Sequence, residues 1–117
     1  MINLFALVKN GTTALGSNPC RFYEFGQAPT LEILPYCTWQ ELNFSPFFTF
    51  DRGINPTDML KVQLDVWATT TAEVRAITRE IRLALNPYVD VNFCQFVWDE
   101  ASKLYRAIIH ITYAKEI

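Results

Sequence analysis

Hydrophobic and polar residues alternate along residues 60–68, and the alternation then gives way to a helical period. Every second position of the first segment is apolar, which is the pattern of a half-buried strand. These positions are Leu60, Val62, Leu64, Val66 and Ala68. From residue 72 to residue 85 the apolar residues fall on one side of a helix instead. They are Val74, Ile77, Ile81, Ala84 and Leu85. Thr70 and Glu73 have the spacing of a capping box, so the sequence predicts a strand that leads directly into an amphipathic helix.

Shorter patterns on either side predict the remaining elements. The apolar residues of segment 2–10 gather on one side of a helical wheel, whereas strand-like composition or alternation marks 20–25, 36–44, 89–98 and 103–113. One face of the strand over 36–44 is expected to hold Tyr36, Thr38, Gln40, Leu42 and Phe44. One face of the strand over 89–98 is expected to hold Val89, Val91, Phe93, Gln95 and Val97. Residues 99–102 have the length of a hairpin turn.

The predicted order of elements is α-β-β-loop-β-α-β-β. Such an order is typical of an α+β layer fold, in which helices cover one face of a mostly antiparallel sheet. We therefore expect one α+β domain over residues 1–117, with a sheet of about four to five strands and two helices packed on it.

The segment between the second and third predicted strands, residues 45–58, has no sustained period. It contains two prolines and one glycine, and it is longer than the ~4–6 residues that usually connect elements in a compact domain. Its phenylalanines, Phe47, Phe48 and Phe50, allow two interpretations. They fill the local core, or they reach onto a neighbouring protein together with Arg52. We favour the second interpretation, because a long apolar loop is costly to leave in water.

Composition and charge narrow the function classes. Half of the residues are hydrophobic and 15% are aromatic, which suggests that some apolar surface meets a partner or a second copy of the chain. The formal net charge of −2 disfavours nonspecific binding of nucleic acid. No apolar run approaches the ~18 residues of a transmembrane helix, so no membrane partner is expected. The first residues lack a basic leader and a clear cleavage site, so we expect no signal peptide.

Residues with catalytic or ligand-binding potential are few and scattered. The single histidine, His110, lies inside a predicted strand with no nucleophile motif near it, which favours a structural role over a general base. The cysteines form no CxxC pair, which favours reduced and buried thiols over disulfides or a metal site. They are Cys20, Cys37 and Cys94. The glycines form no phosphate loop. We therefore expect no enzymatic activity, no cofactor, no metal and no small-molecule substrate.

The predicted helix over residues 72–85 carries a stripe of arginines. Arg75, Arg79 and Arg82 are spaced i, i+4 and i+7, roughly opposite the apolar stripe. A solvated basic face is the ordinary interpretation. The functional alternative is that the stripe meets acidic groups of a neighbouring subunit or lines a lumen through which DNA passes. A smaller apolar edge beside the stripe predicts a second contact face, made of Ala72, Ala76 and Leu83.

Several stretches, taken in their order and spacing, carry a resemblance to a known family. They are the opening helix, Arg21-Phe22-Tyr23 with Ala28-Pro29, Pro35-Tyr36, the run from Val62 to Glu73 with a helix ending in Leu83-Ala84-Leu85, and Leu104-Tyr105-Arg106. Across nearly its whole length the chain resembles the tail terminator proteins, also called tail completion or minor tail proteins, of long-tailed bacteriophages. The family pattern is structural, so it transfers no catalytic residue.

The resemblance implies an α+β structural protein of the virion. Such a subunit assembles in the host cytoplasm into a ring, expected to be a homohexamer, at the junction of tail and head. The ring caps the last ring of the tail tube, stops its polymerisation and offers a surface to the head-side connector. The implied partners are further copies of the chain, the tail tube protein and the connector or neck protein, with DNA only passing through the lumen. Our candidate interface residues are Phe47, Phe48, Phe50, Arg52, Ala72, Arg75, Ala76, Arg79, Arg82 and Leu83.

Two other functions fit parts of the pattern. Phage neck proteins share similar folds, so an adaptor at the head–tail connector is one alternative. The other is a small α+β module that stacks nucleic-acid bases on an open sheet face. Its platform would consist of Tyr23, Trp39, Trp67 and Trp98. The acidic balance of the chain disfavours this second alternative.

Overall fold

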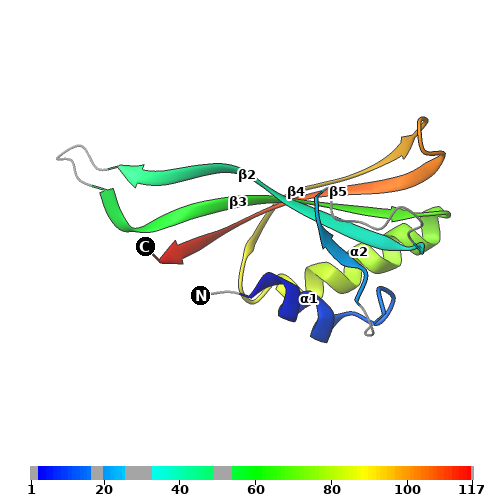
Figure 1. The fold of residues 1–117 in the computed structure, drawn as a ribbon, viewed down its shortest axis with the longest axis horizontal. Helices are drawn as coiled ribbons and strands as arrows, with labels where there is room; N and C mark the ends of the chain where they lie inside the picture. Colours follow the sequence, from blue (N-terminus) through cyan, green and yellow to red (C-terminus); the bar gives the residue numbers. More distant parts are fainter. Residues whose placement is uncertain (1–2, 17–19, 26–32, 49–53, 117) are drawn as a thin grey trace.

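A computed structural model describes residues 3–16, 20–25, 33–48 and 54–116 of the chain, with the backbone alone for 43–48, 54–59 and 114–116 (Figure 1). The elements in chain order are α1 (Leu4–Gly11), β1 (Phe22–Glu24), β2 (Tyr36–Phe48), β3 (Ile54–Ala68), α2 (Thr71–Leu85), β4 (Asp90–Asp99) and β5 (Leu104–Glu116). This confirms the predicted α+β class and, apart from the loop treated below, the predicted order. Neither described helix is long and apolar enough to span a membrane.

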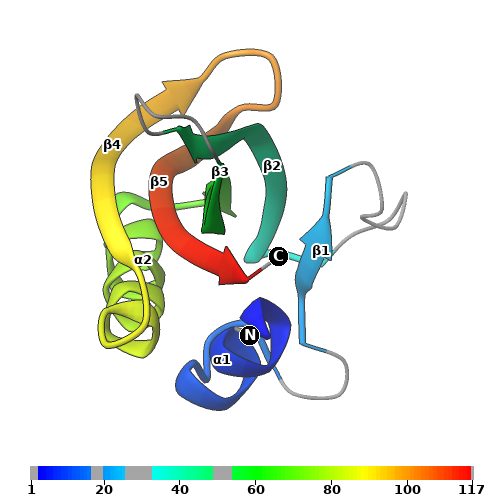
Figure 2. The same cartoon turned by 90° about the vertical axis from the view of Figure 1, so that its left-hand side faces the viewer.

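The strands form one mixed sheet with the order β1-β2-β3-β5-β4. All neighbouring strands are antiparallel except β1 and β2, which are parallel. Both helices lie on the same side of the sheet (Figure 1). Seen along the strands, α2 lies near β4 and α1 lies nearer β1 (Figure 2). The sheet therefore has one helix-covered face, one helix-free face and two edges, β1 and β4.

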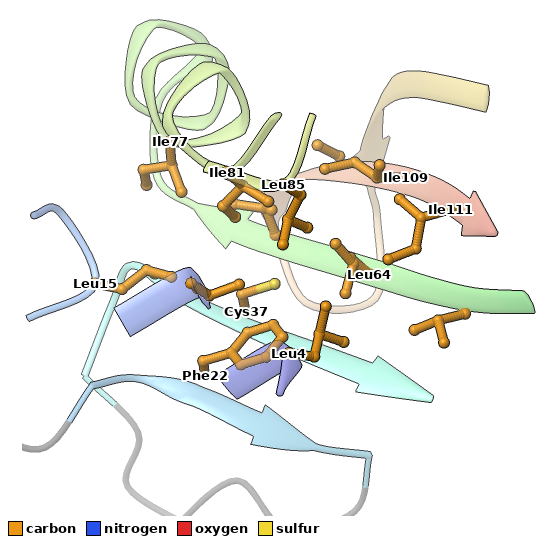
Figure 3. Packing of buried hydrophobic residues seen from close by; sticks show 14 of the residues in the cluster. Leu4, Leu15, Phe22, Cys37, Leu64, Ile77, Ile81, Leu85, Ile109 and Ile111 are labelled. Atoms are coloured by element: carbon orange, nitrogen blue, oxygen red, sulfur yellow. The ribbon is translucent and has the colours of Figure 1, made fainter. Parts of the chain in front are cut away.

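The core fills the space between the helices and the sheet. Ile77, Ile81 and Leu85 of α2 point toward the aliphatic side chains of β3 and β5 (Figure 3). The sheet supplies Leu64, Val66, Ile109 and Ile111, all fully buried. Thr70 starts α2 as predicted, because its side chain accepts a hydrogen bond from the Glu73 backbone N–H at 3.1 Å. The alternating apolar residues of β3 and the apolar stripe of α2 thus pack together in one layer.

β-bulges change the predicted faces of two strands. Val91 pairs with Ile111, but Phe93 pairs with His110, so the extra residue Asn92 moves Phe93 to the opposite face from Val91. The single face expected for Val89 through Val97 is therefore wrong. A second bulge lies between Glu41 and Phe44, and it takes Phe44 out of phase with the face that begins at Tyr36. Strict alternation in a sequence does not show where a strand gains one residue.

The loop predicted over residues 45–58 is wrong for most of its length. Residues 45–48 continue β2 and residues 54–58 belong to β3, with pairs such as Pro46↔Asp58 and Phe48↔Ile54. Residues 49–53 lie outside the described residues. The two prolines that suggested a loop occupy tolerant places, since Pro46 lies beyond the short ladder to β1 and Pro56 lies before the ladder to β5. The result is a hairpin arm that extends past the helices of a molecule measuring 50 × 29 × 25 Å (Figure 1).

Candidate functional site

The predicted interface residues fall into two groups at opposite ends of the long axis. The six candidates on α2 are all exposed: Ala72, Arg75, Ala76, Arg79, Arg82 and Leu83. Phe47 and Phe48 belong to the β2 side of the hairpin arm, whereas Phe50 and Arg52 lie outside the described residues. Figure 1 shows the arm at one end and α2 toward the other end of the molecule. The fold does not bring the two groups into one site.

The two flanks of α2 have different partners. On one flank, the Glu80 carboxylate accepts hydrogen bonds from the Thr13 hydroxyl at 3.0 Å and from the backbone N–H groups of Thr13 and Ala14, each at 3.2 Å. Partial burial raises the pKa of Glu80, but these hydrogen bonds outweigh it and leave the pKa below its ordinary value. On the other flank, the arginine stripe lies alongside β4. This differs from the predicted position, which was roughly opposite the buried stripe.

A groove of about 420 Å³ runs between α2 and β4. Its walls are Arg75, Thr78, Arg79, Arg82, Leu83, Asn86 and Phe96. The Arg75 guanidinium carbon lies 5.0 Å from the centre of the Phe96 ring, so a cation–π contact joins the helix to the strand. We call Arg75, Arg79, Arg82, Leu83 and Phe96 the basic edge. It combines three exposed cations with an exposed apolar centre, in which Leu83 is 66% and Phe96 40% exposed.

β4 is an unprotected edge of the sheet. Among the described strands it pairs with β5 alone, so the backbone polar groups along its outer side have no strand partner. Phe93, Phe96 and Trp98 of this strand are each at least 40% exposed. Phe96 was missing from the predicted interface, because alternation along a strand does not reveal that the strand lies at an edge. The strand order supplies that information.

The opposite edge of the sheet carries two exposed carboxylates. Glu24 of β1 pairs in register with Trp39, and Glu41 lies two residues farther along β2, so both exposed carboxylates lie on the helix-covered face. Two exposed phenylalanines accompany them, Phe5 at 43% and Phe25 at 57%. We call Glu24, Glu41, Phe5 and Phe25 the acidic edge. Sequence reasoning missed it, because its members are single residues from separate elements.

Neither edge is neutralised by an ion pair within the described part of the chain. The ion pairs within the described residues are Lys103–Glu100 in the hairpin turn and Arg106–Asp65 on the helix-free face. The three arginines of the basic edge and the two glutamates of the acidic edge therefore have no ion-pair partner in the described part of the chain. Unpaired charges beside exposed aromatic rings are typical of the rim of a protein interface.

The helix-free face carries a closed polar network. Arg106 donates to Asp65 at 2.9 Å, and Gln63 donates to the same carboxylate at 3.1 Å. The His110 ring nitrogen Nε2 lies 3.0 Å from the Gln63 side-chain oxygen. Arg106 also lies over the Trp67 ring, 5.1 Å from its centre. His110 is thus a hydrogen-bonded strand residue, as predicted.

The base-stacking platform suggested by the sequence is not formed. Tyr23 and Trp67 occupy the helix-free face, whereas Trp39 stacks on buried Phe22 on the other side of the sheet. Trp98 also lies on the helix-covered side, where it packs against Tyr105 with ring centres 4.9 Å apart. Because the four aromatic side chains are divided between two faces, they do not make one surface for successive bases.

The cysteines offer no reactive centre in the part of the chain that is described. Cys20 and Cys37 are buried, Cys94 is half-buried, and all three are free thiols. Burial raises the pKa of the Cys37 thiol well above its ordinary value, so the nucleophilic thiolate is disfavoured. Among the described residues, no three metal-binding side chains come together.

Comparison with known proteins agrees with a structural role. The profile of the family described as Tail completion protein gp17 matches residues 4–113, from α1 into β5. A search of curated proteins found no match. The matched residues include both edges of the sheet and both helices. The chain therefore belongs to the tail completion protein family of bacteriophages, whose members are structural components of the virion tail.

Proposed function

We propose that this protein forms a homohexameric ring that caps the phage tail tube, ends its polymerisation and offers a joining surface to the head-side connector. The family match supports the role in the tail. The observation that supports a ring is the difference between the two edges of the sheet. A ring needs a heterologous interface, in which one surface of a subunit meets a different surface of the next. The basic and acidic edges are two such surfaces.

The hairpin arm suits an axial contact. It extends beyond the helices (Figure 1), so a subunit in a ring can reach out of the ring plane without disturbing the lateral edges. We assign Phe47, Phe48, Phe50 and Arg52 to this contact with the tube or with the neighbouring subunit. DNA only passes through the lumen, and no chemical step is assigned to the chain.

Polymerising tail tube protein in the presence and absence of the purified chain tests the proposal. We expect short tubes with added density at one end in electron micrographs, and a six-subunit mass for the chain that is released from them. Tubes that grow to the same length with and without the chain would contradict the capping function. Binding to DNA-filled heads but not to tubes would identify a neck adaptor instead.

A triple variant of the arm separates capping from ring formation. Phe47→Ser, Phe48→Ser and Phe50→Ser together are expected to abolish arrest of tube growth. An unchanged subunit mass of the ring would identify the tube as the partner of the arm, and a smaller mass would identify the neighbouring subunit. Phe93→Ser is the control, because Phe93 is an exposed phenylalanine of β4, outside the arm and outside the basic and acidic edges. Normal capping by the triple variant would contradict the role of the arm.

A further inference from the structure

The structure assigns the lateral contact of the assembly to a specific pair of surfaces: the basic edge of one copy docks on the acidic edge of the next. This inference rests on the proposed ring and deepens it by naming the surfaces that meet. The occupant of each edge is therefore a second copy of this chain. Charge, apolar surface and topology each support the pairing.

The charges of the two edges are complementary. Within the described residues, Arg75, Arg79 and Arg82 form no ion pair with a carboxylate, and Glu24 and Glu41 form none with a cation. The net charge of the chain is −2 although the stripe contributes three positive charges, so the rest of the chain is more acidic than the total suggests. Complementary fields of this kind orient partners before contact and suppress wrong pairings.

Each edge also has the apolar centre that a protein interface needs. Leu83 and Phe96 line one groove with the arginines. At the other edge, Phe25 follows Glu24 in the chain, and Phe5 packs against Phe22 of β1. Phe5 is supported from below by Phe22, with ring centres 6.4 Å apart, so at least one aromatic ring of the acidic edge is held in place. An apolar centre surrounded by charge is the usual anatomy of a protein–protein contact.

The topology prevents one chain from satisfying both edges. β4 and β1 are the two ends of the strand order, and α2 and α1 follow the same separation (Figure 2). A two-fold dimer through the basic edge would place arginines against arginines, which is unfavourable. Docking of unlike edges leaves one free edge at each end of the assembly, and closure into a ring, where the rotation between subunits allows it, pairs these last two edges.

Charge reversal of one edge tests the pairing directly. The basic-edge variant carries Arg79→Glu and Arg82→Glu, and the acidic-edge variant carries Glu24→Arg and Glu41→Arg. Each variant alone is expected to weaken self-association about 100-fold or more, because like charges then face each other across the contact. Sedimentation of the full chain, in solution and bound to tail tubes, measures the effect. All four positions are exposed, so circular dichroism and thermal melting should match wild type.

Mixing the two variants gives the decisive result. One variant has two acidic edges and the other has two basic edges, so they are expected to assemble only together and in alternation. Native mass spectrometry should find equal numbers of both variants in the mixed ring. The control variant Lys61→Glu/Lys103→Glu makes the same change in net charge as the basic-edge variant, at positions outside both edges, and should associate like wild type.

The outcomes separate this inference from the proposed function. If either single-edge variant assembles as well as wild type, or if mixing restores nothing, the pairing of edges is wrong although the wild-type ring still caps tubes. If wild-type chains associate neither in solution nor on tubes, the ring itself is wrong and the pairing falls with it.

Discussion

The two faces of the sheet are stabilised by different interactions. On the helix-covered face, Leu64, Val66 and Ile109 are fully buried beneath α1 and α2. On the helix-free face, Gln63, Asp65 and Arg106 alternate with these residues along the same strands and form hydrogen bonds and an ion pair. Burial of apolar surface away from water stabilises the helix-covered face. Hydrogen bonds and an ion pair between polar side chains stabilise the helix-free face.

This difference indicates where the molecule can accept a partner. On the covered face the helices bury the apolar centre, and exposed aromatic rings remain at the two edges of the sheet, Phe96 in β4 and Phe25 directly after β1. On the helix-free face, Asp65 forms an ion pair with Arg106, and the side-chain oxygen of Gln63 lies within hydrogen-bond distance of the His110 ring. The unpaired charges of the basic and acidic edges, in contrast, lie beside exposed aromatic rings. This is why we place the lateral contacts of the proposed ring there.

The largest effect is expected from a cavity beneath the helices. Ile109→Ala removes a fully buried side chain and should lower the free energy of unfolding by about 2–5 kcal/mol. Ile108→Ala is the matched control, since Ile108 is the neighbouring residue on the half-exposed face of the same strand. Denaturant unfolding of both variants measures the comparison. Equal losses would mean that the two faces bury their aliphatic side chains alike.

A smaller but clear loss is expected where α1 and α2 approach each other. A Cβ atom on Gly11 would lie 2.3 Å from the Cβ of Ala84, which is closer than two carbon atoms tolerate. Gly11→Ala should force the helices apart and destabilise the fold by about 1–3 kcal/mol. Asn10→Ala, an exposed change one residue earlier, serves as control. An unchanged melting temperature for Gly11→Ala would contradict tight contact between the helices.

On the helix-free face, the strongest single test is Asp65→Asn. The substitution removes the charge that Arg106 and Gln63 share. It should cost about 1–2 kcal/mol, because weaker neutral hydrogen bonds replace hydrogen bonds to a charged group. Asp90→Asn makes the same chemical change at an exposed position and should have little effect. Denaturant midpoints compare the two variants, and equal stability of both would show that the polar network does not hold this face.

The smallest effect is expected to depend on pH. Because the pKa of Glu80 is lower in the folded chain than its ordinary value, its ionised form stabilises the fold above that value. This stabilisation should be lost as the pH falls through the lowered pKa. Glu80→Gln should be less stable than wild type by about 1 kcal/mol at neutral pH, and the gap should close in acid. Thermal melting across the acidic range measures the gap, and a gap that is constant with pH would contradict the contribution of the carboxylate.

Local sequence determined the elements at the centre of the molecule. Alternation in β3 and the helical period of α2 are each written in contiguous residues, and Thr70 caps α2 through a contact three residues away. Short-range patterns of this kind survive folding because they depend on backbone geometry and on one apolar side. The exposed arginine stripe was predictable for the same reason. The order of such elements was enough to suggest the phage family that the profile match then showed.

Only the tertiary structure decided which surfaces are free. The bulge at Asn92 reversed the faces of β4, and the strand order placed β4 and β1 at the edges. Strand pairing also extended β2 and β3 through two prolines into the arm. The same pairing brought Glu24 and Glu41, from separate strands, to one face of the sheet. These features depend on pairing between residues distant in the chain, and no local period encodes them. The sequence by itself therefore determined the buried centre and the family, whereas strand pairing decided the edges through which we expect the subunits to meet.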